Sequence, residues 1–148
     1  MEAIDFTLYD QTGSPVTLSS FKKKWVVLYF YPKNTASFAK EMLEQFHLYK
    51  NKFKRRGAHI LLINPESVSA NFSLPYRDMS ILSDPGKDVI RSYNLIIERE
   101  VEGKVFQTII PTMLLISPEF NIVRKWENAR DASIIEEALK TIDLLKSH

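Results

Sequence analysis

The stretch WVVLYFYPKNTASFAKEMLEQF, residues 25–46, contains the transition on which the fold depends. Its first seven residues are apolar and rich in β-branched and aromatic side chains, which predicts a strand buried on both faces. A short polar turn follows residues 31–33, and from about Ala36 to Arg56 apolar residues recur at helical spacing. The sequence therefore predicts a buried strand, a turn and a long helix that ends at Gly57.

Further strands follow on either side of this stretch. The apolar run AHILLIN, residues 58–64, predicts a second central strand. Shorter apolar segments next to turn residues predict the remaining strands at residues 6–8, 16–18, 79–84, 108–117 and 122–126, with a hairpin or excursion over 98–106. The segment from Met113 to Trp126 should form an antiparallel hairpin.

Polar residues mark the expected helix starts. Thr35 and Ser37 stand before the long helix as candidate N-caps, although the free amides there could also hold an anion. Asn64, followed by proline, predicts the start of a short helix that runs towards Phe72. One or two helical turns are expected over 87–93. The sequence SIIE, residues 133–136, has the pattern of a capping box before a final amphipathic helix.

The order of these elements indicates the fold class. Parallel strands joined by helices, followed by an antiparallel hairpin and a last helix, describe an α/β protein with a thioredoxin-like fold. We expect a central mixed sheet with helices on both faces. At 148 residues, with no internal repeat or linker, the chain is expected to form a single domain over 1–148.

Composition and charge exclude several classes of function. The chain has no cysteine, which excludes disulfides, thiolate metal sites and thiol catalysis. The net charge of +2 does not favour nucleic-acid binding. The basic segment KNKFKRRG, residues 50–57, is interpreted as a solvated helix end, with a nucleic-acid or membrane patch as the alternative. No signal peptide or membrane-spanning run is evident, so we expect a cytoplasmic protein.

No motif for a cofactor or a metal ion is present. The three histidines, His47, His59 and His148, lack the spacing of metal ligands relative to one another, and none has a catalytic setting. Phosphate-binding loops, dinucleotide fingerprints and Ser-His-Asp arrangements are also missing. We therefore predict no cofactor and no metal.

Three segments together resemble the peroxiredoxin family, and its bacterioferritin comigratory protein (peroxiredoxin Q) branch in particular. They are DFTLYDQTGSPVTLSSFKKKWVVLYFYPKNT at 5–35, LSDPGKDVIRSYNL at 82–95 and MLLISPEFNIVRKW at 113–126. The resemblance covers nearly the whole chain. It implies a peroxiredoxin-type thioredoxin fold.

The resemblance also implies where an active site would lie. The catalytic loop of the family reads P-K-x-x-T-P-G-C-T-x-E, whereas residues 32–41 here read PKNTASFAKE and are one residue shorter. Pro32 and Thr35 are retained. Phe38 then stands where the family has its peroxidatic cysteine, and Ser37 lies one position away. The resemblance further places Leu43 at the position of the resolving cysteine, and Pro111 or Ile110 at that of the activating arginine.

These substitutions remove the groups that peroxide reduction needs, namely a thiolate, a cation to lower its pKa and donors to polarise the O–O bond. We therefore expect a degenerate site at Phe38, and a binding or interaction module that pairs with a protein partner or forms a homodimer. The alternative is an antioxidant peroxiredoxin or thioredoxin-like oxidoreductase. It requires that cysteine naturally occupies the site, or that another chemistry operates.

The sequence Ile110-Pro111-Thr112 also resembles the I-P-T of thioredoxins, in which the proline is cis and faces the active-site loop. Only about 5% of X–Pro bonds in folded proteins are cis, but the resemblance makes cis and trans bonds equally expected at Pro111. In either form the proline would shape a binding surface or begin a strand.

Overall fold

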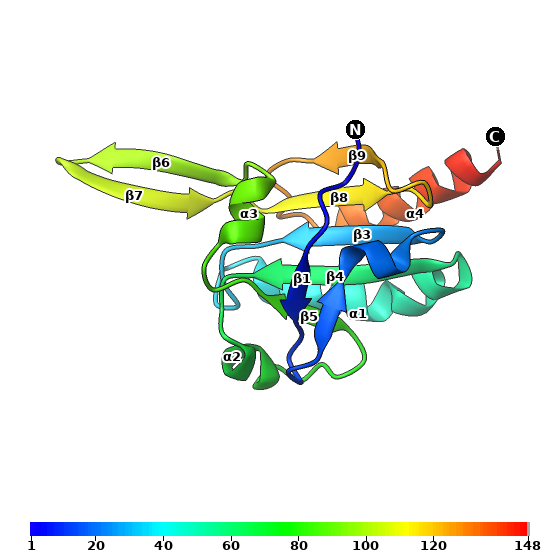
Figure 1. Ribbon diagram of the computed structural model, residues 1–148, viewed down its shortest axis with the longest axis horizontal. Helices are drawn as coiled ribbons and strands as arrows, with labels where there is room; N and C mark the ends of the chain where they lie inside the picture. The colour runs from blue at the N-terminus through cyan, green and yellow to red at the C-terminus, as the bar shows by residue number, and fades with distance from the viewer. Residues whose placement is uncertain (148) are drawn as a thin grey trace.

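A seven-stranded mixed sheet forms the centre of the protein, as the computed structural model, which describes residues 1–147, shows (Figure 1). Its strands lie in the order β2-β1-β5-β4-β3-β8-β9. Their bounds are β1 Thr7–Tyr9, β2 Pro15–Thr17, β3 Trp25–Phe30, β4 Ala58–Asn64, β5 Ser80–Ser83, β8 Thr112–Ile116 and β9 Ile122–Trp126. The pairs β3–β4 and β4–β5 are parallel, and the other pairs are antiparallel.

The two apolar runs form the middle of this sheet, as predicted. Every residue of β3 is buried, and β4 covers the predicted span from Ala58 to Asn64. β3 lies between β4 and β8, so its backbone is paired on both edges. A strand in this position is covered on both faces as well, which is why its sequence is an uninterrupted apolar run.

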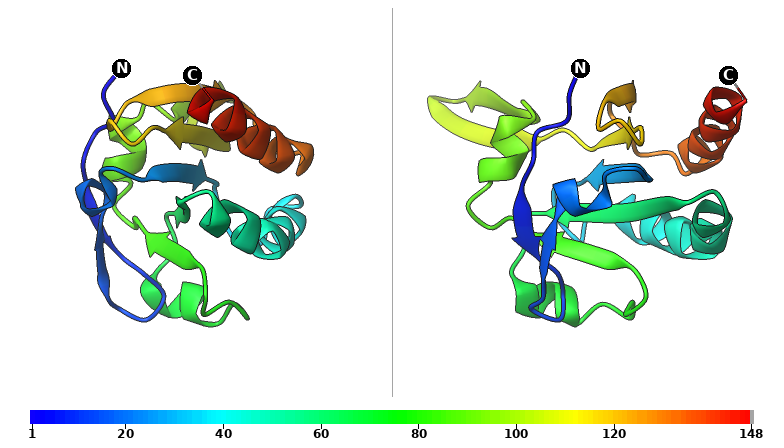
Figure 2. Two further views of the ribbon diagram at one scale, coloured as in Figure 1. Left: turned by 90° about the vertical axis from the view of Figure 1, so that its right-hand side faces the viewer. Right: turned by 45° about the vertical axis from the view of Figure 1, so that its right-hand side comes forward.

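Helices and loops cover both faces (Figure 2). The helices are η1 Leu18–Phe21, α1 Ala39–Arg55, α2 Val68–Phe72, α3 Asp88–Ser92 and α4 Ser133–Lys146. The long helices α1 and α4 pack on one face, where their apolar residues join those of the sheet in one buried cluster. On the other face η1, α3 and the N-terminal segment pack against a second cluster. The thioredoxin-like arrangement expected from the sequence is confirmed.

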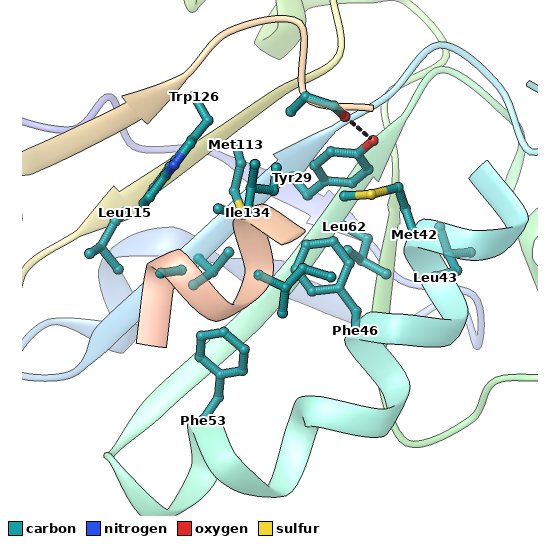
Figure 3. Packing of buried hydrophobic residues seen from close by; sticks show 14 of the residues in the cluster. Tyr29, Met42, Leu43, Phe46, Phe53, Leu62, Met113, Leu115, Trp126 and Ile134 are labelled. Carbon is teal, nitrogen blue, oxygen red and sulfur yellow. Dashed lines mark hydrogen bonds between the residues drawn. The ribbon is translucent and has the colours of Figure 1, made fainter. Parts of the chain in front are cut away.

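The cluster under α1 and α4 is the larger of the two cores (Figure 3). Met42 and Phe46 of α1 are fully buried, as are Met113 of β8 and Ile135 of α4. Burial of a side chain of this size stabilises the fold by roughly 1.5–3 kcal/mol. These contacts hold the first turn of α1, and the loop before it, against the sheet.

The start of α1 differs from the expectation. The helix begins at Ala39 rather than Ala36, and neither Thr35 nor Ser37 caps it, because its N-cap is Phe38 with helical φ and ψ of −94° and −11°. Two consecutive turns precede the helix instead, in which the amide of Ala39 donates to the carbonyl of Ala36. The short loop therefore continues into the helix without an extended residue to carry a cap.

Two other helix starts were also predicted wrongly. α2 begins after Ser67, whose hydroxyl accepts from the amide three residues on, whereas Asn64 directs its side chain into a buried network. At α4 the carboxylate of Asp131 accepts from the amide of Ser133 at 2.9 Å. Ser133 itself is already helical and makes no cap, so the predicted capping box does not form.

The predicted hairpin over 98–106 is confirmed as β6 Ile96–Val101 and β7 Lys104–Ile109. These two strands form a sheet of their own that projects from one end of the molecule (Figure 1). The predicted strand 108–117 is consequently divided between β7 and β8. Pro111 lies at the division in the trans form, since the described residues contain no cis peptide bond.

Candidate functional site

The loop between β3 and α1 lies where the three parallel strands end. β3, β4 and β5 are parallel, so Tyr31, Asn64 and Ser83 come together at their carboxyl ends. This edge is where open α/β sheets bind their ligands. It is also the edge at which the sequence predicts the degenerate site.

A buried network of amides and hydroxyls fills this edge. The side chains of Asn64 and Asn71 exchange hydrogen bonds of 2.9 and 3.0 Å, and Asn71 also donates to Ser83 Oγ at 2.9 Å. Asn64 donates to the hydroxyl of Tyr31 at 2.9 Å, and this hydroxyl in turn donates to Asn34 Oδ1 at 2.6 Å. Every buried side-chain nitrogen and oxygen in the described residues has a partner.

Asn34 connects this network to the loop that leads into α1. Its amide donates to Glu66 Oε2 at 2.6 Å and to Asn71 Oδ1 at 2.9 Å. Burial raises the pKa of the Tyr31 hydroxyl well above its usual value near 10, so this group remains a neutral donor. The loop is therefore fixed by hydrogen bonds among amides, the neutral hydroxyl of Tyr31 and the carboxyl group of Glu66, and Tyr31 supplies no phenolate at neutral pH.

Phe38 closes the other side of the loop. Its ring is partly buried and packs against the core cluster that contains Tyr31 and Trp126. The guanidinium carbon of Arg130 lies 5.4 Å from the ring centroid, within the range of a cation–π contact. An apolar ring and a cation thus occupy the position that the resemblance assigns to the reacting sulfur.

Arg130 is held in place by its neighbours after β9. The amide of Ala129 donates to the carbonyl of Pro111 at 2.7 Å, and the carbonyl of Ala129 accepts from the hydroxyl of Tyr29 at 2.7 Å (Figure 3). Burial raises the pKa of Tyr29 as well. The segment 129–130 therefore connects Pro111 on one side with Phe38 on the other.

The remaining predicted residues divide into two groups. Pro32 is partly buried, and Thr35 and Ser37 are exposed on the loop beside Phe38. Leu43 does not join them, because it is only 3% exposed and faces the core from α1 (Figure 3). Phe38 and Pro111 are linked through the segment 129–130, whereas Leu43 belongs to the packing of the helix.

Sequence reasoning missed both the asparagine network and Arg130. Asn34 lies 30 residues before Asn64 in the chain, and asparagine in such positions usually indicates a turn or a cap. Arg130 stands in the polar segment ENARD after β9, where nothing local indicates an aromatic partner. Only the three-dimensional arrangement brings these residues to the loop.

The described part of the chain has neither a metal-binding cluster nor a membrane-spanning helix. Residues 1–147 contain no group of three or more His, Asp or Glu side chains arranged to hold a metal ion. His47 instead contacts Asp78, His59 packs against Phe21 in a tilted arrangement, and His148 lies outside the described residues. Within 1–147, no helix has the length and apolar character needed to span a bilayer.

Comparison with known proteins places the chain in a family. Peroxiredoxin Bcp of Xanthomonas campestris is 26% identical over 147 residues, covering 97% of this chain and 90% of that protein. Chloroplastic peroxiredoxin Q of Sedum lineare is 37% identical over 93 residues, which are 61% of this chain but only 50% of the plant protein. The chain thus matches about half the length of this plant relative.

Solved structures agree with the sequence relatives. One solved structure is that of the bacterioferritin comigratory protein of Xanthomonas campestris, which was studied for its alkyl peroxide reduction activity. It superposes on this chain with a TM-score of 0.87 at 25% identity. It covers 94% of this chain and 90% of the other. A peroxiredoxin Q variant of Xylella fastidiosa has a TM-score of 0.84 at 26% identity, covering 95% and 89%. Residues 1–125 match the AhpC/TSA family, and the chain belongs to it as a cysteine-free homologue of the Bcp and peroxiredoxin Q proteins.

Proposed function

We propose that this protein is a non-catalytic member of the AhpC/TSA family that acts by binding another protein. The observation that carries the proposal is the contact between Phe38 and Arg130. The ring can neither ionise nor attack a peroxide, and its π face is in contact with the guanidinium of Arg130. The loop therefore presents a closed, chemically inert surface.

The surrounding groups support the absence of thiol peroxidase activity. The chain contains no cysteine, so neither a peroxidatic nor a resolving thiol is available. The buried hydroxyls of Tyr29 and Tyr31 have raised pKa values and are engaged with Ala129 and Asn34. Thr35 and Ser37 are exposed, and no described residue hydrogen-bonds to their side chains as a base would.

The ribbon formed by β6 and β7 supports the binding role. A two-stranded ribbon is only marginally stable without a surface to pack on. Nevertheless the ribbon carries exposed apolar side chains: Ile97 (41%), Phe106 (50%) and Val101 (55%) on one face, and Val105 (64%) on the other. A cluster of this kind on a projecting element is typical of a protein interaction site.

The strand register separates the ribbon into two unlike faces. Arg99 pairs with Phe106 and Val101 pairs with Lys104, so one face combines apolar side chains with two cations. The alternate pairs place Glu98 and Glu100 on the opposite face. We propose that the basic and apolar face binds an acidic surface on a second copy of this chain or on a cysteine-bearing relative.

A peroxide-consumption assay tests the first half of the proposal. Hydrogen peroxide and an organic hydroperoxide are followed with dithiothreitol or thioredoxin as reductant, beside a cysteine-bearing family member as positive control. We expect no turnover above the buffer. Turnover that scales with protein concentration would refute the non-catalytic assignment and favour an oxidoreductase with another chemistry.

The mass in solution tests the second half. Light scattering after size exclusion should detect self-association, or a complex with the added relative. The change Phe106→Ser should weaken association, whereas Leu144→Ser, which removes a side chain of 60% exposure from α4, should not. Equal weakening by both changes, or association that neither affects, would exclude the ribbon as the contact.

A further inference from the structure

A cavity of about 520 Å³ lies at the opposite end of the parallel strands from Phe38. It is formed where β4 and β5 begin, with residues 57–60 on one side and 78–80 on the other. Lys24, just before β3, and the last two turns of α1 complete the wall. Ligand pockets typically have volumes of roughly 300–1,000 Å³, so the space suits a small molecule.

Three lysines line this cavity, namely Lys24, Lys50 and Lys54. Lys50 is neutralised by Asp78, whose carboxylate lies 3.2 Å from its Nζ. Within the described residues, Lys24 and Lys54 have no carboxylate within 4.0 Å. Two positive charges from different segments of the chain therefore remain uncompensated beside one concave surface.

The same cavity carries neutral polar and apolar groups. Asn51 and Ser80 offer an amide and a hydroxyl, whereas Ile60 and Met79 supply apolar surface. His59 packs at an angle of 54° against Phe21, with ring centroids 4.8 Å apart, and adds an aromatic ring to the lining. Polar and apolar groups therefore line the cavity together, and the charges of Lys50 and Asp78 are paired within it.

We propose that this cavity binds a small organic phosphate. A phosphomonoester carries a charge of about −1.5 to −2 at neutral pH, and three acceptor oxygens. The ammonium groups of Lys24 and Lys54 match the charge, and the donors of Asn51 and Ser80 can satisfy further oxygens. The organic part would then pack on the apolar lining formed by Ile60 and Met79. This site is independent of the ribbon and of the loop at Phe38.

The cations of the basic segment at residues 50–56 differ in their contacts. Within it Lys50 and Arg56 form ion pairs with Asp78 and Asp143, whereas Lys54 extends along the cavity wall. A merely solvated helix end would not require a cation from Lys24, which lies in a different loop. The contribution of two separate segments distinguishes a pocket from a basic stripe.

Titration of the ¹⁵N-labelled protein with AMP and with glucose 6-phosphate tests the proposal. Adenosine and glucose serve as uncharged counterparts. We expect both phosphates to shift the amide signals of residues 57–60 and 78–80, and the parent compounds to leave them unchanged. Binding should weaken as ionic strength rises, because the charges face solvent. If neither phosphate shifted these amide signals, the assignment would be overturned.

Variants then distinguish the cavity from a diffuse basic surface. Lys24→Gln and Lys54→Gln should each weaken binding of AMP about threefold to tenfold. Arg55→Gln is the matched control, because Arg55 is exposed on the same helix and does not line the cavity. Unchanged affinity in the lysine variants, or an equal loss in Arg55→Gln, would overturn the proposal. Circular dichroism of each variant confirms that the fold is intact.

Discussion

Truncation of Asn71 to alanine should destabilise the protein more than any surface change of similar size. This side chain is fully buried and makes four hydrogen bonds, to Asn34, to Ser83 and two to Asn64. Without it the hydroxyl of Ser83 loses its side-chain partner, which costs about 1–3 kcal/mol, and the other lost bonds add about 0.5–1.5 kcal/mol each. Allowing for rearrangement of the remaining amides, we expect a loss of about 2–5 kcal/mol in the free energy of unfolding.

Urea denaturation followed by circular dichroism measures this loss, and the thermal midpoint should fall by roughly 5–15 °C. Asn51→Ala is the matched control, because Asn51 is exposed on α1 and the change should stay within about 0.5 kcal/mol. If Asn71→Ala also stayed within that limit, the network would contribute no net stability. The account of how the loop before α1 is fixed would then be wrong.

Three further predictions concern ionisable groups. In Phe38→Cys the guanidinium of Arg130 should lower the pKa of the new thiol. Alkylation by iodoacetamide at pH 7 should then be about threefold to tenfold faster than in Phe38→Cys/Arg130→Gln. Equal rates would show that the cation does not reach the site. Burial raises the pKa of Tyr93 to about 12, and Tyr29 and Tyr31 are shifted in the same direction. These neutral hydroxyls stabilise the fold fully below pH 10 and less as the pH rises above 10. The absorbance of their phenolates should therefore appear together with unfolding. Ionisation of all tyrosines before unfolding would contradict this prediction. Burial, with Lys24 nearby, lowers the pKa of His59 below 6.5. The free energy of unfolding should therefore fall as the pH drops below 6.5, and it should fall less steeply in His59→Gln. Parallel curves for the two proteins would contradict the assignment.

The strands and the fold class could be predicted because burial leaves a direct trace in the sequence. The runs at residues 25–31 and 58–64 are apolar throughout, since both faces of β3 and β4 are covered. The ribbon was also found, because Gly103 stands between two polar strands. These features depend on local residue type, and a single sequence contains them.

The helix starts and the site geometry could not be predicted in the same way. Asn64 has the identity of a cap, yet the approach of Asn71 recruits its side chain into the core. Ser133 fits a capping box, but it lies inside the helix, and its own amide donates to the carboxylate of Asp131. At Pro111 the resemblance left the cis and trans forms open, and the structure has the trans form. At Asn64, contacts from other elements decided between two locally reasonable outcomes.

The prediction of a degenerate site at Phe38 remains a prediction that rests on the family resemblance. The structure contributes the surroundings, in which Arg130 lies over the ring of Phe38 and Ala129 is hydrogen-bonded to Pro111. The expectations of a cytoplasmic location and of a single domain likewise await direct measurement. Expression of the chain alone, followed by a test for one cooperative unfolding transition, addresses the domain prediction.

The position of β3 between β4 and β8 has a consequence for synthesis of the chain. β4 follows β3 after a single helix, whereas β8 begins only at Thr112. A nascent polypeptide therefore leaves one edge of its most apolar strand unpaired until about three quarters of it has been translated. Ribosome-bound chains that stop before this residue should bind chaperones and aggregate on release, and those that extend past β9 should not.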